Sequence, residues 1–233
     1  MNTNKNSYII IYSAILVVVV AFLLAFVYAA LKPQQDINVA LDKKKQILAS
    51  LNIRDLSDAE AATKYTEVVE CDEIIDTNAA VINKGEKGGE NAGFKLNSAD
   101  LKEGKLAVYV CNVDGEKKYV IPVYGMGLWG SIWGYIALDA DKNTIYGAYF
   151  DHQGETAGLG AEIKDSKAWQ DHFKGKKIFS ADGAAVAIAV KKASDVKNPA
   201  SEVDAVTGAT LTSDGVSLML QESFSKYVTF LKK

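Results

Sequence analysis

The sequence predicts an α+β protein in which an N-terminal transmembrane helix precedes a domain with an antiparallel sheet and flanking helices. Three patterns carry this prediction. A long uncharged apolar run lies near the N-terminus, the middle of the chain alternates apolar and polar residues, and segments on both sides of that middle repeat their apolar residues every three to four positions. Because the strand-like segments are consecutive rather than alternating with helices, an antiparallel sheet is favoured over a βαβ arrangement.

The apolar run from Tyr8 to Leu31 predicts a membrane anchor. At about 1.5 Å per residue, its helix would exceed the ~30 Å thickness of the hydrocarbon core of a bilayer. The alternative is a signal peptide cleaved near Ala29-Ala30, but the apolar region of such peptides is normally about 7–15 residues long. We therefore expect an uncleaved anchor within residues 1–33 that ends at Lys32-Pro33, because proline commonly follows a helix end.

Residues 34–104 are expected to form a lead-in of helices and loops. Apolar residues from Val39 to Leu51 recur with a helical period, and Asp58 to Glu70 is a second, shorter helix candidate. Glycines, asparagines and charges from Asn83 to Gly93 indicate a loop.

Residues 105–233 are expected to form the main domain. Four segments alternate with a period of two, and the turn pair Asp114-Gly115 joins the first two. The predicted strands are Leu106–Val113, Lys118–Val123, Ser131–Leu138 and Thr144–Phe150. The later segments are a helix over Leu159–Phe173 with Trp169 and Phe173 on one face, a strand over Ala185–Val190, and an amphipathic helix over Ser213–Leu231.

Composition excludes several classes of function. The 233 residues allow one anchor and one ordinary domain, and a net charge of −3 without a basic patch argues against nucleic acid. Cys71 and Cys111 are too far apart in sequence for a Cys-x-x-Cys motif, and both a disulfide and two buried thiols remain open. His152 and His172 are isolated, so no metal site is predicted.

A glycine-rich segment, Gly125-Met126-Gly127-Leu128-Trp129-Gly130, formally matches the dinucleotide pattern G-x-G-x-x-G. That site needs a helix after the glycines, whereas Ser131 to Leu138 is β-branched, aromatic and interrupted by glycine. We therefore expect no NADH site in this chain. The segment is either a turn with Trp129 and Trp133 in the core, or an apolar wall beside a flat aromatic ligand.

Two further segments contain polar side chains at the expected start of a helix. In Asp151 to Gly160, Glu155 and Thr156 are either first-turn residues or ligand contacts, and no nucleophile–base pair accompanies them, so no catalytic residue is predicted. The other segment holds four hydroxyls around a glycine, Thr207, Thr210, Thr212 and Ser213. Such hydroxyls are usually N-caps, but a helix start also binds anions.

The spacing Asp204-x-x-Thr207-x-Ala209-Thr210 resembles the motif in which flavin transferases esterify the last threonine to the phosphate of FMN. Together with Gly-x-Gly-Leu128-Trp129 and Glu155-Thr156-x-Gly158-Leu159-Gly160, it makes the chain resemble the NqrC family of the Na+-translocating NADH:quinone oxidoreductase. The resemblance covers roughly Lys105 to Leu231 and the single anchor. The family often has serine where this chain has Thr207, and proline where it has Ala157.

The resemblance implies a single-pass protein of the bacterial inner membrane with its C-terminal domain on the extracytoplasmic side. The local charges oppose this orientation, because lysines are more numerous after the anchor than before it. It further implies electron transfer from NADH towards quinone through a covalent FMN, with other subunits of the complex as partners and a flavin transferase for maturation. The alternatives are an Rnf-type electron-transport subunit and a non-redox, membrane-tethered binding or assembly module.

The resemblance also implies the residues of the site. Thr210 would carry the FMN phosphoryl group, four neighbours would surround the phosphate, and five residues from the two earlier loops would line the flavin. The phosphate set is Thr207, Gly208, Ala209 and Thr212, and the flavin set is Leu128, Trp129, Glu155, Thr156 and Leu159. Lys197 is added because its loop precedes the motif.

Overall fold

A computed structural model of the protein describes residues 5–96, 100 and 103–233. The chain divides into two compact units between Lys43 and Lys44. The first helix, α1 (Asn6–Ser50), belongs to both units, because its last residues are part of the second. Each unit is considered by itself below.

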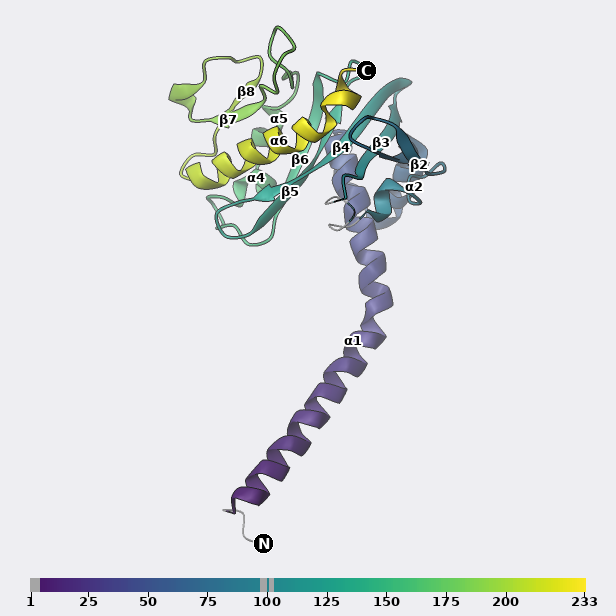
Figure 1. Cartoon of the computed structure of the whole chain (residues 1–233), viewed down its shortest axis with the longest axis vertical. Helices are drawn as coiled ribbons and strands as arrows, with labels where there is room; N and C mark the ends of the chain where they lie inside the picture. The colour runs from purple at the N-terminus through teal and green to yellow at the C-terminus, as the bar shows by residue number, and fades with distance from the viewer. Residues whose placement is uncertain (1–4, 97–99, 101–102) are drawn as a thin grey trace. The chain divides into compact units, whose positions relative to one another are not determined.

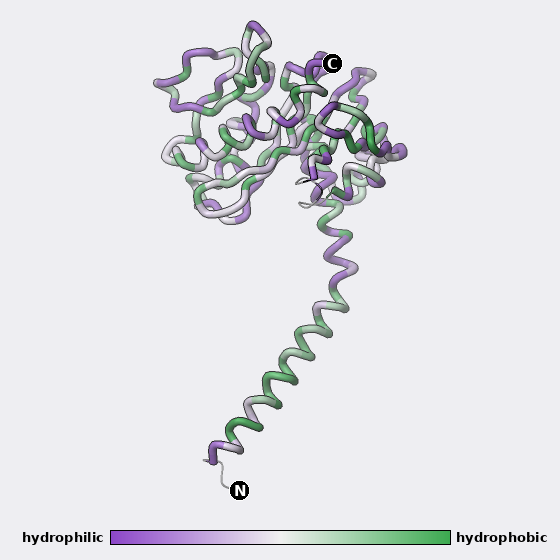
Figure 2. Tube along the Cα trace, in the orientation of Figure 1, coloured by the Kyte–Doolittle hydropathy of each residue, from purple (hydrophilic) through white to green (hydrophobic). Residues whose placement is uncertain are grey.

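In the N-terminal unit, α1 is the one helix among the described residues that is long and apolar enough to cross a membrane. Figure 2 shows its apolar stretch in green, followed by a hydrophilic stretch in purple. The expected helix end at Lys32-Pro33 is wrong, since Pro33 lies inside the helix, while the boundary of the membrane-spanning part stays a prediction. Proline removes only its own N–H donor and disturbs the turn before it. The residues that follow include good helix formers such as Ala40, Leu41 and Lys43, and the backbone hydrogen bonding of the helix continues through them.

The end of α1 is buried in the C-terminal unit. Ile47 and Leu48 are 0% exposed, and Leu51 just after the helix is 1% exposed. Burying such a side chain contributes about 1.5–3 kcal/mol. We expect a chain that begins at Lys44 to fold, whereas one that begins at Asn52 should lose a large part of a typical ~5–15 kcal/mol stability. Thermal unfolding followed by circular dichroism measures both, and equal melting temperatures would contradict this prediction.

The C-terminal unit is built on a six-stranded sheet with the order β2-β1-β3-β4-β5-β6 (Figure 1). Every neighbouring pair in it is antiparallel. The strands are β1 (Val69–Ile75), β2 (Val81–Lys84), β3 (Leu106–Val113), β4 (Glu116–Met126), β5 (Ser131–Leu138) and β6 (Ile145–His152). The predicted α+β class and antiparallel sheet are confirmed. The turn between β3 and β4 has Asp114 at φ 53 and Gly115 at φ 85, which is the left-handed conformation that this hairpin turn requires.

The two edges of the sheet differ. Along β6, the side chains of Asn52 and Arg54 donate hydrogen bonds of 3.0 Å to the carbonyl groups of Tyr146 and Ala148, which closes that edge. The opposite edge strand, β2, is exposed along its whole length. It is short, which limits the unpaired backbone it offers.

The lead-in contributes strands as well as helices. The predicted helix over Asp58–Glu70 is present as α2 (Asp58–Val68), with a complete capping box between Ser57 and Glu60. The strands β1 and β2 were not expected. β1 follows α2 without a breaker, and it is a strand because it pairs with β3 on one side and β2 on the other. A short 3-10 helix, η1 (Gly93–Lys95), ends the described part of this region before residue 97.

Both cysteine thiols are free and buried. Cys71 is paired with Val110 and Cys111 with Val69, so the two residues do not face each other across the strands. Burial raises the pKa of both thiols. They are therefore core residues of low nucleophilicity.

Helices cover the sheet and complete the core. The long helix α6 (Thr210–Leu231) packs on β4 and β5, as Figure 1 shows, and Tyr227 Oη donates to the carbonyl of Ala107 on β3 at 2.8 Å. The predicted helix over Leu159–Phe173 is instead two short helices, α4 (Glu162–Asp165) and α5 (Lys167–Asp171). Ser166 breaks the helix because its hydroxyl caps α5 by accepting the N–H of Trp169. Trp169 and Phe173 still share one face, with ring centroids 5.2 Å apart.

A small parallel pair of strands precedes α6. It consists of β7 (Ala189–Lys191) and β8 (Glu202–Asp204), with the 3-10 helix η2 (Ala193–Asp195) between them. The predicted strand over Ala185–Val190 is thus shorter and shifted towards the C-terminus. The chain continues from β8 to the start of α6.

Candidate functional site

Three segments that are distant in sequence meet around one cavity of about 190 Å³. They are the turn between β4 and β5, the loop between β6 and α4, and the start of α6. The lining residues are Leu128, Glu155, Thr156, Leu159, Gly160, Gly208, Ala209, Thr210, Leu211 and Thr212. Eight of these were predicted from the sequence as cofactor-binding residues, so the fold gathers most of the predicted set in one place.

The start of α6 has no side-chain cap. Its N-cap residue is Ala209, and no side-chain hydrogen bond is made there. The capping alternative fails for both hydroxyls considered, because Thr212 Oγ1 donates to Glu155 and Ser213 Oγ accepts the N–H of Val206. The first N–H groups of a helix have no partner within the helix and lie at the positive end of its dipole. This helix end is therefore open to an anionic group.

Thr210 occupies the first position of α6, where it is exposed and lines the cavity. The preceding Gly208 has φ +77, and a Cβ at that position would lie 3.0 Å from Leu159 Cδ2. Glycine both adopts this left-handed conformation and leaves room beside the leucine. The hydroxyl of Thr210 is thus presented at the helix N-terminus on a backbone that only glycine allows without strain.

Glu155 is buried, at 8% exposure, and both of its carboxylate oxygens have partners. Oε1 accepts the backbone N–H of Trp129 at 2.9 Å, and Oε2 accepts the hydroxyl of Thr212 at 2.6 Å. A buried carboxylate requires such donors, since its desolvation is otherwise costly. Both side chains also line the cavity, and each carboxylate oxygen can accept a second hydrogen bond, so the predicted contacts of Glu155 and Thr212 to a ligand stay a prediction.

Three of the predicted residues do not line the cavity. Trp129 is joined to the site through its backbone, but its side chain is 70% exposed, so it is not a core residue. Thr207 is exposed and follows the strand that leads to α6. Lys197 lies on the loop before β8, where its backbone N–H donates to Glu202 at 2.6 Å. Sequence reasoning missed Gly160 as a site residue, although its motif contains it, and Leu211, whose only signal was its place beside Thr210.

Glu202 organises the loop that contains Lys197. Its carboxylate accepts the backbone N–H groups of Asn198 and Lys197 and pairs with Lys191 at 2.5 Å. These interactions, of which the N–H of Asn198 has the largest effect on the pKa, lower the pKa of Glu202 well below its ordinary value, to about 2. Because its folded pKa is depressed, this stabilisation is present above the unfolded pKa and is lost as the pH falls.

We therefore expect Glu202→Gln to lower the melting temperature at pH 7. The amide oxygen can replace Oε2, which accepts both N–H groups, but the NH2 group cannot accept from Lys191 and the negative charge is lost. The difference from the wild type should shrink as the pH falls from about 4.5 to about 2. Thermal unfolding at a series of pH values measures this. A difference that stays constant over that range would contradict the prediction.

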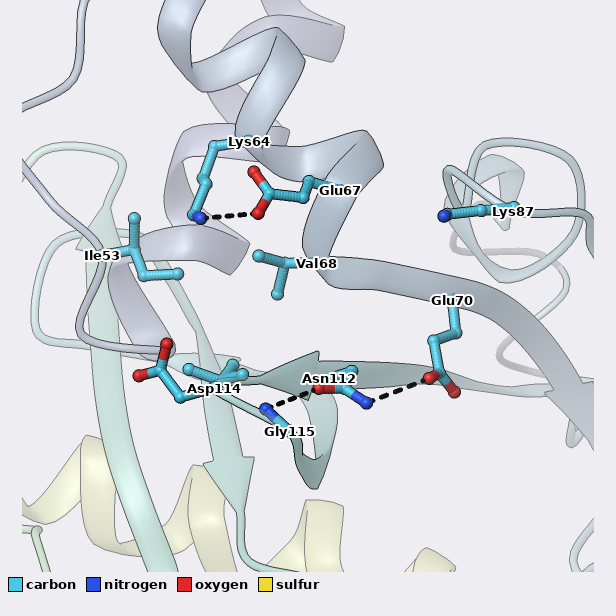
Figure 3. Close-up of a pocket in the computed structure, with 10 residues that line it drawn as sticks. Ile53, Lys64, Glu67, Val68, Glu70, Lys87, Asn112, Asp114 and Gly115 are labelled. Atoms are coloured by element: carbon cyan, nitrogen blue, oxygen red, sulfur yellow. Dashed lines mark hydrogen bonds and ion pairs between the residues drawn. The ribbon is translucent and has the colours of Figure 1, made fainter.

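A larger cavity, of about 490 Å³, lies elsewhere, between α2 and the β3–β4 turn (Figure 3). None of the predicted site residues lines it. Its charged groups are partly paired with each other, as in the contact of Lys64 with Glu67 at 3.1 Å. Size alone therefore does not locate the site, and the smaller cavity is the better candidate on chemistry.

The same part of the chain matches a known domain family. Residues 127–225 match the family model of the FMN-binding domain. This range begins at the β4–β5 turn and ends within α6, so it includes all three segments around the cavity.

The chain is also similar to named proteins over most of its length. It is 32% identical to the NqrC protein of the Na+-translocating NADH-quinone reductase of Pasteurella multocida, over 87% of this chain and 85% of that protein. The crystal structure of the corresponding protein from Parabacteroides distasonis is 41% identical, with a TM-score of 0.78, over 87% of this chain and 98% of that one. The structure of NqrC from Shewanella oneidensis is 25% identical, with a TM-score of 0.67, over 84% of this chain and 99% of that one. The chain therefore belongs to the NqrC family of Na+-translocating NADH-quinone reductase subunits.

Proposed function

We propose that this chain is a membrane-anchored flavoprotein subunit that relays electrons in a Na+-translocating NADH:quinone reductase, through an FMN joined by a phosphoester to Thr210. The observation that carries the proposal is the start of α6. It is a helix end without a side-chain cap that presents an exposed threonine hydroxyl inside a cavity lined by the predicted cofactor residues.

The residues fit the phosphate of FMN. The N–H groups at the start of α6 are suited to a phosphate, and Gly208 allows its close approach. In the attachment step, Thr210 Oγ1 attacks the phosphorus of an activated FMN donor, a phosphoanhydride such as a flavin dinucleotide. The new O–P bond replaces the phosphoanhydride bond, the hydroxyl proton is released, and a nucleoside monophosphate leaves. A flavin transferase would catalyse this exchange.

The residues also fit the ring. The cavity of about 190 Å³ is smaller than the ~300–1,000 Å³ of typical ligand sites, so we expect it to hold only part of FMN. Around it are the exposed side chains of Leu128, Trp129, Leu159 and Leu211, which offer an apolar surface to a flat aromatic group. FMN supplies one- and two-electron transfer, and this chain supplies tether and orientation.

We propose that this chain receives electrons from NADH through partner subunits. Its G-x-G-x-x-G segment runs from β4 through a turn closed by Gly127 N–H and the Gly130 carbonyl at 2.8 Å, and then continues as β5. A dinucleotide site needs a helix there. The exposed, uncharged segment from Met126 to Trp129 beside the cavity is suited to contact with another subunit, because exposed apolar patches mark such contacts.

The membrane placement that we propose is supported by α1 and by the family resemblance. The apolar part of α1 supports single-pass anchoring in a bacterial inner membrane. We place the C-terminal unit on the extracytoplasmic side, following the family resemblance rather than the local lysine count. Neither the Rnf-type alternative nor the non-redox module is favoured by the relatives, which are named as NADH-quinone reductase subunits.

The proposal is tested by expressing the full chain with a flavin transferase and with the remaining subunits of the complex. We expect flavin fluorescence in the band of this chain on a denaturing gel. In anaerobic membranes, NADH should bleach the absorbance of that flavin before quinone is added. A chain that remains unmodified in the presence of an active transferase would overturn the proposal.

A further inference from the structure

We propose that Glu155 is a positioning residue that assembles the FMN site by holding its three segments together. The inference rests on the proposed function, since it concerns the same site. Glu155 was expected to line the flavin, and we assign its carboxylate a further role within the protein.

The hydrogen bonds of Glu155 connect all three segments. The residue itself lies in the β6–α4 loop. Its Oε1 accepts the N–H of Trp129 in the β4–β5 turn, and its Oε2 accepts the hydroxyl of Thr212 in the first turn of α6. One buried side chain thus fixes the distance between the predicted ring-binding turn and the predicted phosphate-binding helix end.

Glycines on both sides make room for this carboxylate. A Cβ at position 127 would lie 2.5 Å from Glu155 Oε1. A Cβ at position 160 would lie 2.5 Å from Glu155 Oε2 and 2.6 Å from Thr212 Oγ1. These three distances are shorter than normal contacts, so a side chain at either position would displace the Glu155 carboxylate from its hydrogen bonds.

The base of the loop is also fixed. The N–H of Glu155 donates to His152 Nδ1 at 3.1 Å, and the N–H of His152 donates to Asp151 Oδ1 at 2.8 Å. Asp151 is buried and pairs with Lys164 of α4 at 2.8 Å. The backbone from which Glu155 extends is therefore held in place, which allows its side chain to position other residues.

Substituting glutamine for Glu155 distinguishes a role of its hydrogen bonds from a role of its negative charge. Its amide oxygen can accept the N–H of Trp129, and its NH2 group can donate to Thr212 Oγ1, because a hydroxyl can also accept. Glu155→Gln should therefore preserve both links without the charge, whereas Glu155→Ala removes both. A requirement for the negative charge would make the two variants equally defective.

The test uses the full chain expressed with a flavin transferase, as wild type, Glu155→Gln, Glu155→Ala, Thr212→Val and the double variant Glu155→Ala with Thr212→Val. The measurements are the rate of FMN incorporation by intact mass, the visible circular dichroism of the bound flavin, and hydrogen exchange at the Trp129 amide. Thermal unfolding checks that each variant folds. Thr212→Val removes one link only, and keeps the proposal testable should Glu155→Ala fail to fold.

We expect Glu155→Gln to retain incorporation within about threefold of wild type, and Glu155→Ala to lose about tenfold or more. Thr212→Val should lie between them, and should add nothing to Glu155→Ala, because the link it breaks is already gone. Exchange at the Trp129 amide should rise in Glu155→Ala and stay near wild type in Glu155→Gln. Equal defects in the two Glu155 variants, additive effects in the double variant, or an unchanged amide in Glu155→Ala would each overturn the proposal.

Failure of the proposed function gives a different result. If the wild type carried no flavin, incorporation would be absent in every variant. Exchange at the Trp129 amide would still report whether Glu155 holds the turn, so the two proposals fail independently.

Discussion

Thr210→Ala is expected to eliminate covalent FMN from the chain, because it removes the oxygen atom to which the phosphorus is bonded. The helix N-terminus would remain, since the N-cap residue Ala209 uses no side chain from position 210. Intact-mass measurement after expression with a flavin transferase should show the unmodified chain alone. In-gel flavin fluorescence should disappear, and the melting temperature should change little, because an exposed side chain seldom contributes more than about 0.5 kcal/mol.

Two matched variants test whether the loss of covalent FMN is caused by removal of the Thr210 hydroxyl oxygen. Thr210→Ser keeps the hydroxyl and should retain modification. Thr207→Ala should reduce modification less than Thr210→Ala, since Thr207 is exposed and does not line the cavity. Peptide mapping that places the flavin on another residue would contradict the assignment. Complete loss in both alanine variants would contradict the ordering, unless the transferase recognises Thr207.

The sequence predicted those elements whose signals are local. The β3–β4 hairpin follows from alternation on both sides of Asp114-Gly115, and both residues have the positive φ that such a turn needs. α6 follows from an apolar period that runs from Val216 to Leu231, although the helix begins at Thr210, three residues before the predicted Ser213. In each case the residues that determine the element are contained within it.

Elements that depend on distant partners were missed. β1 carries three acidic residues and follows α2 directly, so its sequence resembles the end of an exposed helix. One of those residues, Asp72, is fully buried and accepts the backbone N–H groups of Ala92 and Phe94. That loop lies about twenty residues further along the chain, where no local pattern would reveal the pairing. At Pro33 a local signal was misleading. Proline commonly marks the end of a helix, but here the helix continues on both sides of it.

The same distinction holds for the candidate site. Three short motifs identified most of the cavity lining, since each motif forms one of the three segments that meet there. The bond between Thr212 and Glu155 joins residues that are 57 positions apart, and nothing in either motif specifies it. Lys197 was included because its loop precedes the motif. Glu202 holds that loop through the backbone, Lys197 does not line the cavity, and its contact to the cofactor stays a prediction.

Gly215→Ala is expected to destabilise the C-terminal unit and to impair FMN incorporation, although alanine is the better helix former by about 1 kcal/mol. Gly215 is buried in the second turn of α6, and a Cβ there would lie 2.4 Å from the carbonyl oxygen of Met126. That oxygen belongs to the backbone at the end of β4, so it cannot rotate away as a side chain would. Relieving the overlap requires the start of α6 and the β4–β5 turn to separate, and overpacking of this kind typically costs about 1–3 kcal/mol.

The overlap destabilises the protein, whereas the higher helix propensity of alanine stabilises it. The sign of the change in stability therefore shows which of the two effects is larger. We expect a lower melting temperature and a lower rate of incorporation, since the parting segments are those that Glu155 joins through Trp129 and Thr212. Asp214→Ala, at the exposed neighbouring position, measures propensity without the overlap and should be neutral or stabilising. Gly154→Ala, where a Cβ would meet nothing within 4 Å, should leave the site intact. A Gly215→Ala protein as stable as wild type would show that α6 and the turn do not pack as closely as this structure places them.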